Sequence, residues 1–188
     1  TQPIAVQPNS DQPMTTHKTG IGAPMPRKED HRFLTGAGRF SDDIVVPEML
    51  VGMFLRASVP HGEIAAIDVA AALAAPGVQA VLTAADIEDE ITGPMPSFSN
   101  VPPFDVGRRD GGDATEAAQY PLASDRVRYL GEPVAFIVAD TLARAQNALE
   151  LISVDYRNLQ AGMEIDDALD PGAEQIWPDA PGNISFEW

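Results

Sequence analysis

The chain has 188 residues and contains no cysteine. Disulfide bonds, thiolate metal sites, iron–sulfur ligation and a cysteine nucleophile are therefore excluded within this chain. Basic residues are also scarce: 12 lysines and arginines stand against 28 aspartates and glutamates, a formal net charge of −16 at pH 7. Because phosphate backbones and anionic lipid surfaces require a basic face, we expect neither nucleic acid nor a membrane as a partner.

Long apolar runs are missing as well, since none approaches the roughly 20 residues of a membrane-spanning helix. The first residues, TQPIAVQPNSDQPMTTHKTG, begin with Thr1 rather than Met and lack the basic start, apolar stretch and cleavage site of a signal peptide. We therefore expect a cytoplasmic location. Residues 1–26 are rich in proline and have no hydrophobic period, which predicts a flexible N-terminal arm.

What the chain does have is 44% hydrophobic residues, enough to bury a core. Short apolar runs between turn residues predict buried strands, and an apolar face recurring every three to four residues predicts a helix. A first strand–helix–strand unit follows a strand at Met49–Leu55. The unit comprises a strand at Ile64–Ile67, a helix at Ala70–Ala75 capped by Asp68 and ended by Pro76-Gly77, and a strand at Val78–Thr83.

A second strand–helix–strand unit occupies residues 127–156. Its helix should run from a cap at Asp140 or Thr141 to about Leu151, because Leu142, Ala145, Leu149 and Ile152 share one face. The strands are expected at Val127–Leu130, before a turn at Gly131, at Val134–Ala139 and at Ile152–Tyr156, and a last short helix at Ile165–Leu169.

Together these elements predict an α+β fold with one mixed sheet, built as a single domain over residues 27–170. Residues 88–120 contain proline, Gly-Gly and scattered charge without a period, which indicates a long mobile loop. Residues 171–188 are rich in turn residues and should form an exit from the domain.

The histidines give little sign of a metal site. His17 lies in the arm, His31 in a charged cluster and His61 at a turn, and none pairs with another at helical spacing. We expect ordinary surface histidines. Replacing His61 by Ala should then change stability little, whereas Asp in place of Ile137 or Val138 should be severely destabilising.

Glycines and carboxylates also have structural explanations. Gly20 and Gly22 run into prolines, and Gly36 and Gly38 precede RFSDDIVV, which reads as a strand, so neither pair is a phosphate-binding loop. Gly36 or Gly38 should supply a tight turn. The carboxylate pairs Asp42-Asp43 and Asp166-Asp167 are expected to be structural, and no serine has a hydrolase motif around it: Ser58, Ser97, Ser99, Ser124.

Two charged residues stand beside apolar strands, Arg56 and Glu132. A charge in that position needs a partner or access to water, so we expect both to be paired structurally. The residues themselves thus supply no catalytic, cofactor-binding or metal-binding position.

The pattern as a whole resembles a known family. RKEDHRFLTGAGRFSDDIVVPEMLVGMFLRAS, IDVAAALAAPGVQAVLTAADI and YPLASDRVRYLGEPVAFIVADTLARAQNALELISVDYRNLQ closely resemble the N-terminal α/β-hammerhead domain of molybdenum hydroxylase large subunits. These are enzymes of the xanthine dehydrogenase, aldehyde oxidase and aerobic carbon monoxide dehydrogenase type. One departure is local: family members often read RSPHAHARI where residues 56–64 read RASVPHGEI, so Gly62-Glu63 replaces a small-basic pair.

The resemblance implies a structural and assembly role in an enzyme that oxidises aldehydes, N-heterocycles or similar small substrates, with water as the oxygen source. It implies molybdopterin, as the cytosine dinucleotide, with molybdenum, [2Fe–2S] clusters and FAD in the whole enzyme. The family's catalytic residues lie beyond the hammerhead domain, so no residue is carried over and this chain alone should be inactive. Partners would be the molybdenum-binding remainder, to which residues 171–188 lead, and the iron–sulfur and FAD subunits.

Relatives in the family run several hundred residues further, so the chain is expected to be a fragment or one part of a split subunit. Two other functions stay open from the sequence. One is a stand-alone interaction or assembly module without catalytic activity, and the other is a small acidic enzyme acting alone.

Overall fold

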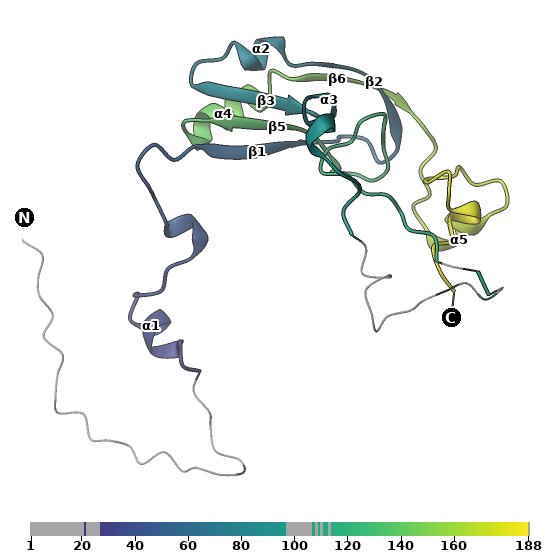
Figure 1. Cartoon of the computed structure of the whole chain (residues 1–188), viewed down its shortest axis with the longest axis horizontal. Helices are drawn as coiled ribbons and strands as arrows, with labels where there is room; N and C mark the ends of the chain where they lie inside the picture. The colour runs from purple at the N-terminus through teal and green to yellow at the C-terminus, as the bar shows by residue number, and fades with distance from the viewer. Residues whose placement is uncertain are drawn as a thin grey trace, which may run out of the picture. The chain divides into compact units, whose positions relative to one another are not determined.

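The computed structural model describes residues 21, 27–96, 107, 109, 111–112 and 114–187 (Figure 1). The chain divides into two compact units, Thr1–Val46 and Pro47–Trp188. In the first unit the described elements are helix α1, Asp30–Leu34, and a 3₁₀ helix η1, Ser41–Asp43. All strands of the described residues belong to the second unit.

One three-stranded sheet has the order β1-β5-β3 and is antiparallel throughout. Its strands are β1 Val51–Arg56, β5 Pro133–Ala139 and β3 Val78–Thr83, which lie side by side in Figure 1. Helices α2, Ala70–Leu73, and α4, Leu142–Leu149, pack on one face of this sheet.

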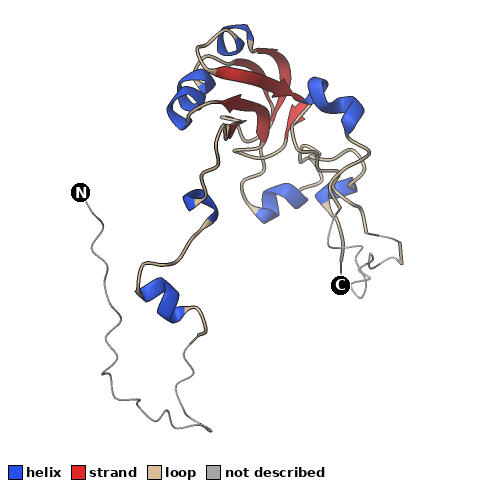
Figure 2. Ribbon diagram, turned by 60° about the vertical axis from the view of Figure 1, so that its left-hand side comes forward, coloured by secondary structure: helices blue, strands red, loops and turns tan. Residues whose placement is uncertain are grey.

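The other three-stranded sheet has the order β4-β2-β6 and is also antiparallel. Its strands are β4 Arg126–Val127, β2 Gly62–Asp68 and β6 Ser153–Asn158. Figure 2 shows the strands gathered together with short helices around them. The remaining elements are α3 Ala84–Ile87, η2 Glu88–Glu90, α5 Ile165–Leu169 and η4 Pro181–Asn183.

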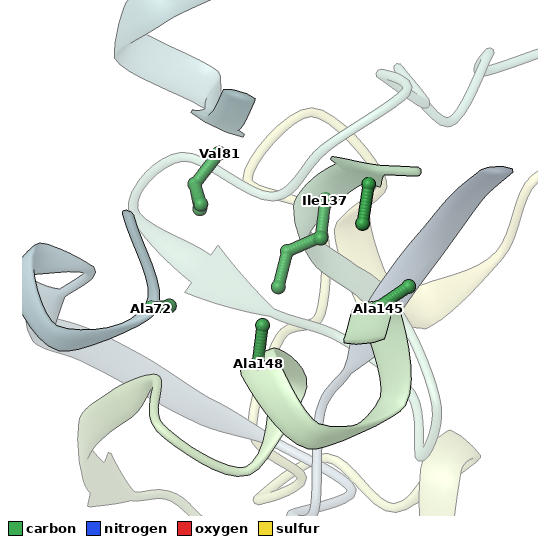
Figure 3. Close-up of a cluster of buried hydrophobic side chains, with 6 residues drawn as sticks. Ala72, Val81, Ile137, Ala145 and Ala148 are labelled. Carbon is green, nitrogen blue, oxygen red and sulfur yellow. The ribbon is translucent and has the colours of Figure 1, made fainter. Parts of the chain in front are cut away.

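The core consists of two clusters of mostly small side chains. In the first, Ile137 is fully buried and points from β5 toward the alanines of α2 and α4 (Figure 3). Small residues on the helices let them approach the sheet closely, so that one isoleucine fills much of the space between the layers. The second cluster, under the β4-β2-β6 sheet, contains Ala57, Ala123, Val127 and Val134.

The α+β class is confirmed, but the single mixed sheet is corrected to two antiparallel sheets. The reason is that the two crossover helices connect strands of different sheets. Helix α2 connects β2 to β3, and helix α4 connects β5 to β6, so each helix joins strands of different sheets. A strand–helix–strand pattern normally makes parallel neighbours within one sheet, and the sequence does not reveal that the partner strand lies in another.

Within the two units most element positions agree with the sequence. Strand β3 and helix α5 have the expected bounds, and the oxygen Oδ1 of Asp68 accepts the Ala70 N–H at 2.9 Å before α2. Thr141 is the N-cap of α4, with its hydroxyl oxygen accepting the Arg144 N–H at 3.3 Å. Pro76-Gly77 forms the expected turn, with Gly77 at a φ of +80°.

Three details differ from the sequence prediction. The buried face of α4 is rotated, because Ala148 is buried and Leu142 is 53% exposed. The strand expected at Val127–Leu130 is shorter in the structure, where β4 ends at Val127. The chain then enters a turn in which the Tyr129 carbonyl accepts the Glu132 N–H. Residues 39–46 contain η1 rather than a strand.

Part of the segment 88–120 is attached to the end of the chain. The Thr115 N–H donates to the Ser185 carbonyl at 2.7 Å, and the Ser185 hydroxyl returns a hydrogen bond to the Thr115 carbonyl at 2.6 Å. The Glu187 N–H donates to the Gly107 carbonyl at 3.1 Å. These described parts of the loop are therefore paired with the exit segment. Among the described residues, no helix has both the length and the apolar character to cross a bilayer.

Candidate functional site

His61 is not a surface histidine. It is 1% exposed, and its Nδ1 lies 2.8 Å from the carbonyl of Gln160, while its own carbonyl accepts the Leu159 N–H at 3.0 Å. Its Nε2 is buried with no hydrogen-bond partner among the described residues. The ring thus joins the start of β2 to the chain just after β6. The prediction of a surface histidine is wrong for His61, so a small effect of His61→Ala on stability is no longer expected.

The sequence placed His61 at a turn, and the backbone does bend there. A histidine after proline at a turn is ordinarily exposed, but here the chain just after β6 bonds to both the ring and the backbone of His61. His31, by contrast, is exposed on α1 as expected, and His17 lies outside the described residues.

The contacts of Glu63 show why an acidic residue suits position 63, where the family pattern has a basic one. Its carboxylate pairs with two arginines, Arg126 at 3.3 Å across the β2–β4 ladder and Arg157 across the β2–β6 ladder. Arg126 also lies 4.0 Å from Glu174. A basic residue at position 63 would face two arginines here, so the acidic side chain matches its surroundings in this chain.

Glu132 and Arg56 are both paired, as expected from their positions beside apolar strands. The Glu132 carboxylate accepts the Arg128 N–H, and its backbone carbonyl accepts the Ala57 N–H at 2.8 Å. Burial raises the pKa of Glu132, and the Arg128 N–H and charge offset this effect in part. Arg56 donates to the Gly131 carbonyl at 3.0 Å.

The other candidate residues have local roles where the structure describes them. Gly36 has a φ of +72° in a turn, as expected, whereas Gly38 has no positive φ. Asp43 accepts the Phe40 N–H at 2.9 Å at the start of η1, and Asp166 and Asp167 lie in the first turn of α5. Ser58 is exposed, Ser124 donates to Asp125 at 3.3 Å, and the rest lie outside the described residues: Gly20, Gly22, Ser97, Ser99.

A groove of about 620 Å³ runs beside β2. It is lined by residues 64–67 of β2, by α3 and the first residue of η2, and by parts of the segment from 120 to 124. Sequence reasoning missed this groove because α3 was not predicted and β4 was expected to be longer.

Two of the polar side chains that line this groove, Thr83 and Ser124, donate hydrogen bonds to neighbouring aspartates. The Thr83 hydroxyl donates to Asp86 at 2.7 Å, and this bond with the Thr83 N–H holds the pKa of Asp86 below its ordinary value. Ser124 donates to Asp125, and no histidine is among the lining residues. The lining therefore suits binding of an apolar group better than proton transfer.

A second hollow of about 360 Å³ lies around α5 and the exit segment, and Asp167, Asp170 and Glu174 are among its lining residues. Nevertheless, the described part of the chain contains no group of three or more His, Asp or Glu side chains placed to hold a metal ion. The donor set that a metal centre requires is not found in these residues.

The described residues thus form two antiparallel sheets linked by crossover helices, with a groove beside β2. The family model described as "Aldehyde oxidase and xanthine dehydrogenase, a/b hammerhead domain" matches residues 35–160. The chain belongs to this family, as its α/β-hammerhead domain.

Known proteins similar to the chain include large subunits of a hydroxylase and of dehydrogenases. It is 37% identical to the nicotine 6-hydroxylase large subunit of Paenarthrobacter nicotinovorans, over 77% of this chain and 16% of that protein. It is 37% identical to the carbon monoxide dehydrogenase large chain of Afipia carboxidovorans, over 85% of this chain and 18% of that protein.

Among solved structures, quinoline 2-oxidoreductase from Pseudomonas putida 86 superposes with a TM-score of 0.67 at 36% identity, covering 79% of this chain and 18% of that one. The chain therefore spans less than a fifth of each of these relatives.

Proposed function

We propose that the chain is the structural and assembly portion of a molybdenum-containing hydroxylase. The whole enzyme oxidises an aldehyde, an N-heterocycle or a similar small substrate and takes its oxygen from water. The observation that carries this proposal is the family match over residues 35–160, together with 37% identity to two oxidoreductase large chains.

In this proposal the chemistry lies on polypeptide outside this chain. Molybdopterin in its cytosine dinucleotide form, with molybdenum, belongs to the molybdenum-binding remainder, and the [2Fe–2S] clusters and FAD belong to separate subunits. The residues described here do not fit a metal centre, because they offer no donor cluster and the chain has no cysteine. We therefore assign no catalytic, cofactor-binding or metal-binding residue to this chain. We also propose that the complex is located in the cytoplasm.

We assign residues 1–26 to an arm, residues 27–170 to the hammerhead domain with its loop at 88–120, and residues 171–188 to a linker toward the molybdenum-binding portion. The side-chain amide of Asn183 supports a defined path for the last segment, since it donates to the carbonyls of Ala168 and Glu174 at 2.9 and 3.1 Å.

The test is purification of the tagged chain from its native source, with mass spectrometry of the co-purifying polypeptides and elemental analysis for molybdenum. We expect a molybdenum-binding polypeptide together with iron–sulfur and FAD subunits. Recovery of the folded chain without any molybdenum-binding polypeptide would contradict the proposal and favour a stand-alone module.

A further inference from the structure

Strand β2 has an edge that its neighbours leave open. On one side it pairs with β6 as far as Asp68. On the other side the β4 ladder includes only Gly62 and Glu63, and the Ile64 N–H makes one further bond to the Asp125 carbonyl at 2.8 Å. Among the described residues, no strand continues this second side along residues 65–68.

The chain before β4 leaves the edge for a definite reason. Instead of continuing along β2, it turns so that the Ala123 N–H donates to the Pro133 carbonyl of β5 at 2.8 Å. Ala123 and the adjacent Leu122 are buried there, 5% and 3% exposed. With the segment bonded to β5 in this way, about four residues of β2, roughly 13 Å, have no strand neighbour on that side within the described part of the chain.

The groove described above follows this edge. Four consecutive residues of β2, 64 to 67, line it. The β2–β6 register shifts between Ile64 and Ala66, and both Ala65 and Ala66 are exposed, so the groove follows the strand past an irregularity at which the backbone comes to the surface. An open edge beside a groove is the geometry in which an extended peptide adds to a sheet by backbone hydrogen bonds.

The groove also defines the side chains that such a segment needs. Its far wall contains Ile87 and Ile91, and the exposed residues on the strand, Ala65 and Ala66, are small enough for a second backbone to approach. The exposed acidic residue Glu88 lines the groove, and two further exposed acidic residues of η2, Asp89 and Glu90, follow it in the chain. The complementary segment is extended, apolar where it enters the groove, and carries lysine or arginine where it passes η2.

We propose that an extended segment of the molybdenum-binding polypeptide adds to β2 at residues 65–68 and continues the line of β4 through this groove. The proposal rests on the proposed function, which supplies that polypeptide as the partner. It assigns the groove a docking role with a basic, apolar strand as its occupant. The shared strand would fix the hammerhead domain to the portion that holds the cofactor.

The first test is hydrogen–deuterium exchange of residues 65–68 in the chain alone and in the complex purified from the native source. Because β6 already pairs with one side of this stretch, we expect free exchange in the chain alone only for those amides of residues 65–68 that face away from β6, and at least about tenfold slower exchange of these same amides in the complex. Slow exchange of the amides that face away from β6 already in the chain alone would show that the chain covers its own edge, and unchanged exchange of these amides in the complex would show that nothing adds there. Either result overturns the proposal.

The second test places a photo-crosslinking amino acid at Ala65, with the exposed Ala143 on α4 as the matched control. We expect Ala65 to crosslink to a basic, apolar peptide of the molybdenum-binding polypeptide and Ala143 not to do so. Crosslinks from Ala65 to an iron–sulfur subunit, an FAD subunit, a second copy of the chain, or to no polypeptide at all refute the docking assignment.

A substitution pair completes the design. Ala66→Arg places a bulky, positively charged side chain in the groove, whereas Ala143→Arg makes the same change on the exposed surface of α4. We expect Ala66→Arg to lower the recovered molybdenum at least about tenfold and Ala143→Arg to leave it unchanged. Equal recovery with a folded Ala66→Arg chain contradicts the inference. If that variant unfolds, the crosslinks decide.

The two proposals fail in different ways. A complex that contains the molybdenum-binding polypeptide but shows no protection or crosslinking at residues 65–68 refutes the docking edge alone. A chain purified without that polypeptide refutes the proposed function.

Discussion

Ile137 is the side chain whose truncation tests the packing of the first core cluster most sharply. It is fully buried between β5 and the alanines of α2 and α4. Ile137→Ala removes three carbon groups, about 2.4 kcal/mol at roughly 0.8 kcal/mol each. The small alanines around it cannot extend into the space, so a cavity term raises the expected loss to about 3–4 kcal/mol.

The neighbouring Val138 is the matched control. It lies on the opposite face of the same strand and is only half-buried, so Val138→Ala should cost about 1 kcal/mol. Urea unfolding followed by far-ultraviolet circular dichroism measures both, with an unchanged slope as the condition for comparing midpoints. Equal losses, or a larger loss at Val138, would refute the assignment of the strand's two faces. The structure thus separates two positions that the sequence treated alike.

Three further predictions concern polar residues. His61→Ala should destabilise the fold by about 2–4 kcal/mol, because it leaves a cavity and an unpaired Gln160 carbonyl. The exposed His31 is the control, and His31→Ala should change stability by no more than about 0.5 kcal/mol. Thermal melts that rank the two variants equally would contradict the buried position of His61. Glu63→Lys should cost about 1 kcal/mol in low salt and less in high salt, since it faces two arginines; a salt-independent loss in chemical denaturation would argue against the ion pairs. Burial raises the pKa of Glu132 above its ordinary value of 4.5, so the folded state holds the proton more tightly than the unfolded state. The free energy of unfolding should therefore fall as the pH rises from about 4.5 through the folded-state pKa. Glu132→Gln should lose this dependence, and identical pH profiles of the two proteins would show that Glu132 is not its cause.

Local patterns predicted the elements well where a short period was decisive. The Pro76-Gly77 turn predicted the start of β3, and the spacing of apolar residues predicted α4. What they could not predict was the pairing of strands. The helices α2 and α4 connect two separate sheets, and this depends on long-range register rather than on any property of the helices themselves.

The same limit explains the site. The buried His61 ring contacts the carbonyl of Gln160, 99 residues further along the chain, where β6 has paired along β2. The groove depends on Ala123 bonding to Pro133, which ends β4 early. Both features arise from contacts between distant segments, so no window of sequence contains them. In contrast, the sequence alone shows that Glu63 departs from the family pattern in its charge. Its two arginine partners, Arg126 and Arg157, could be identified only from the structure.

The central claim is that this chain supports a molybdenum centre held by another stretch of polypeptide. Its most direct test is the molybdenum content and substrate oxidation of the purified chain, produced alone in a cell that synthesises molybdopterin. The account predicts a folded chain with no bound molybdenum and no turnover. Stoichiometric molybdenum retained by this chain alone, or oxidation of an aldehyde or N-heterocycle without a partner, would contradict it.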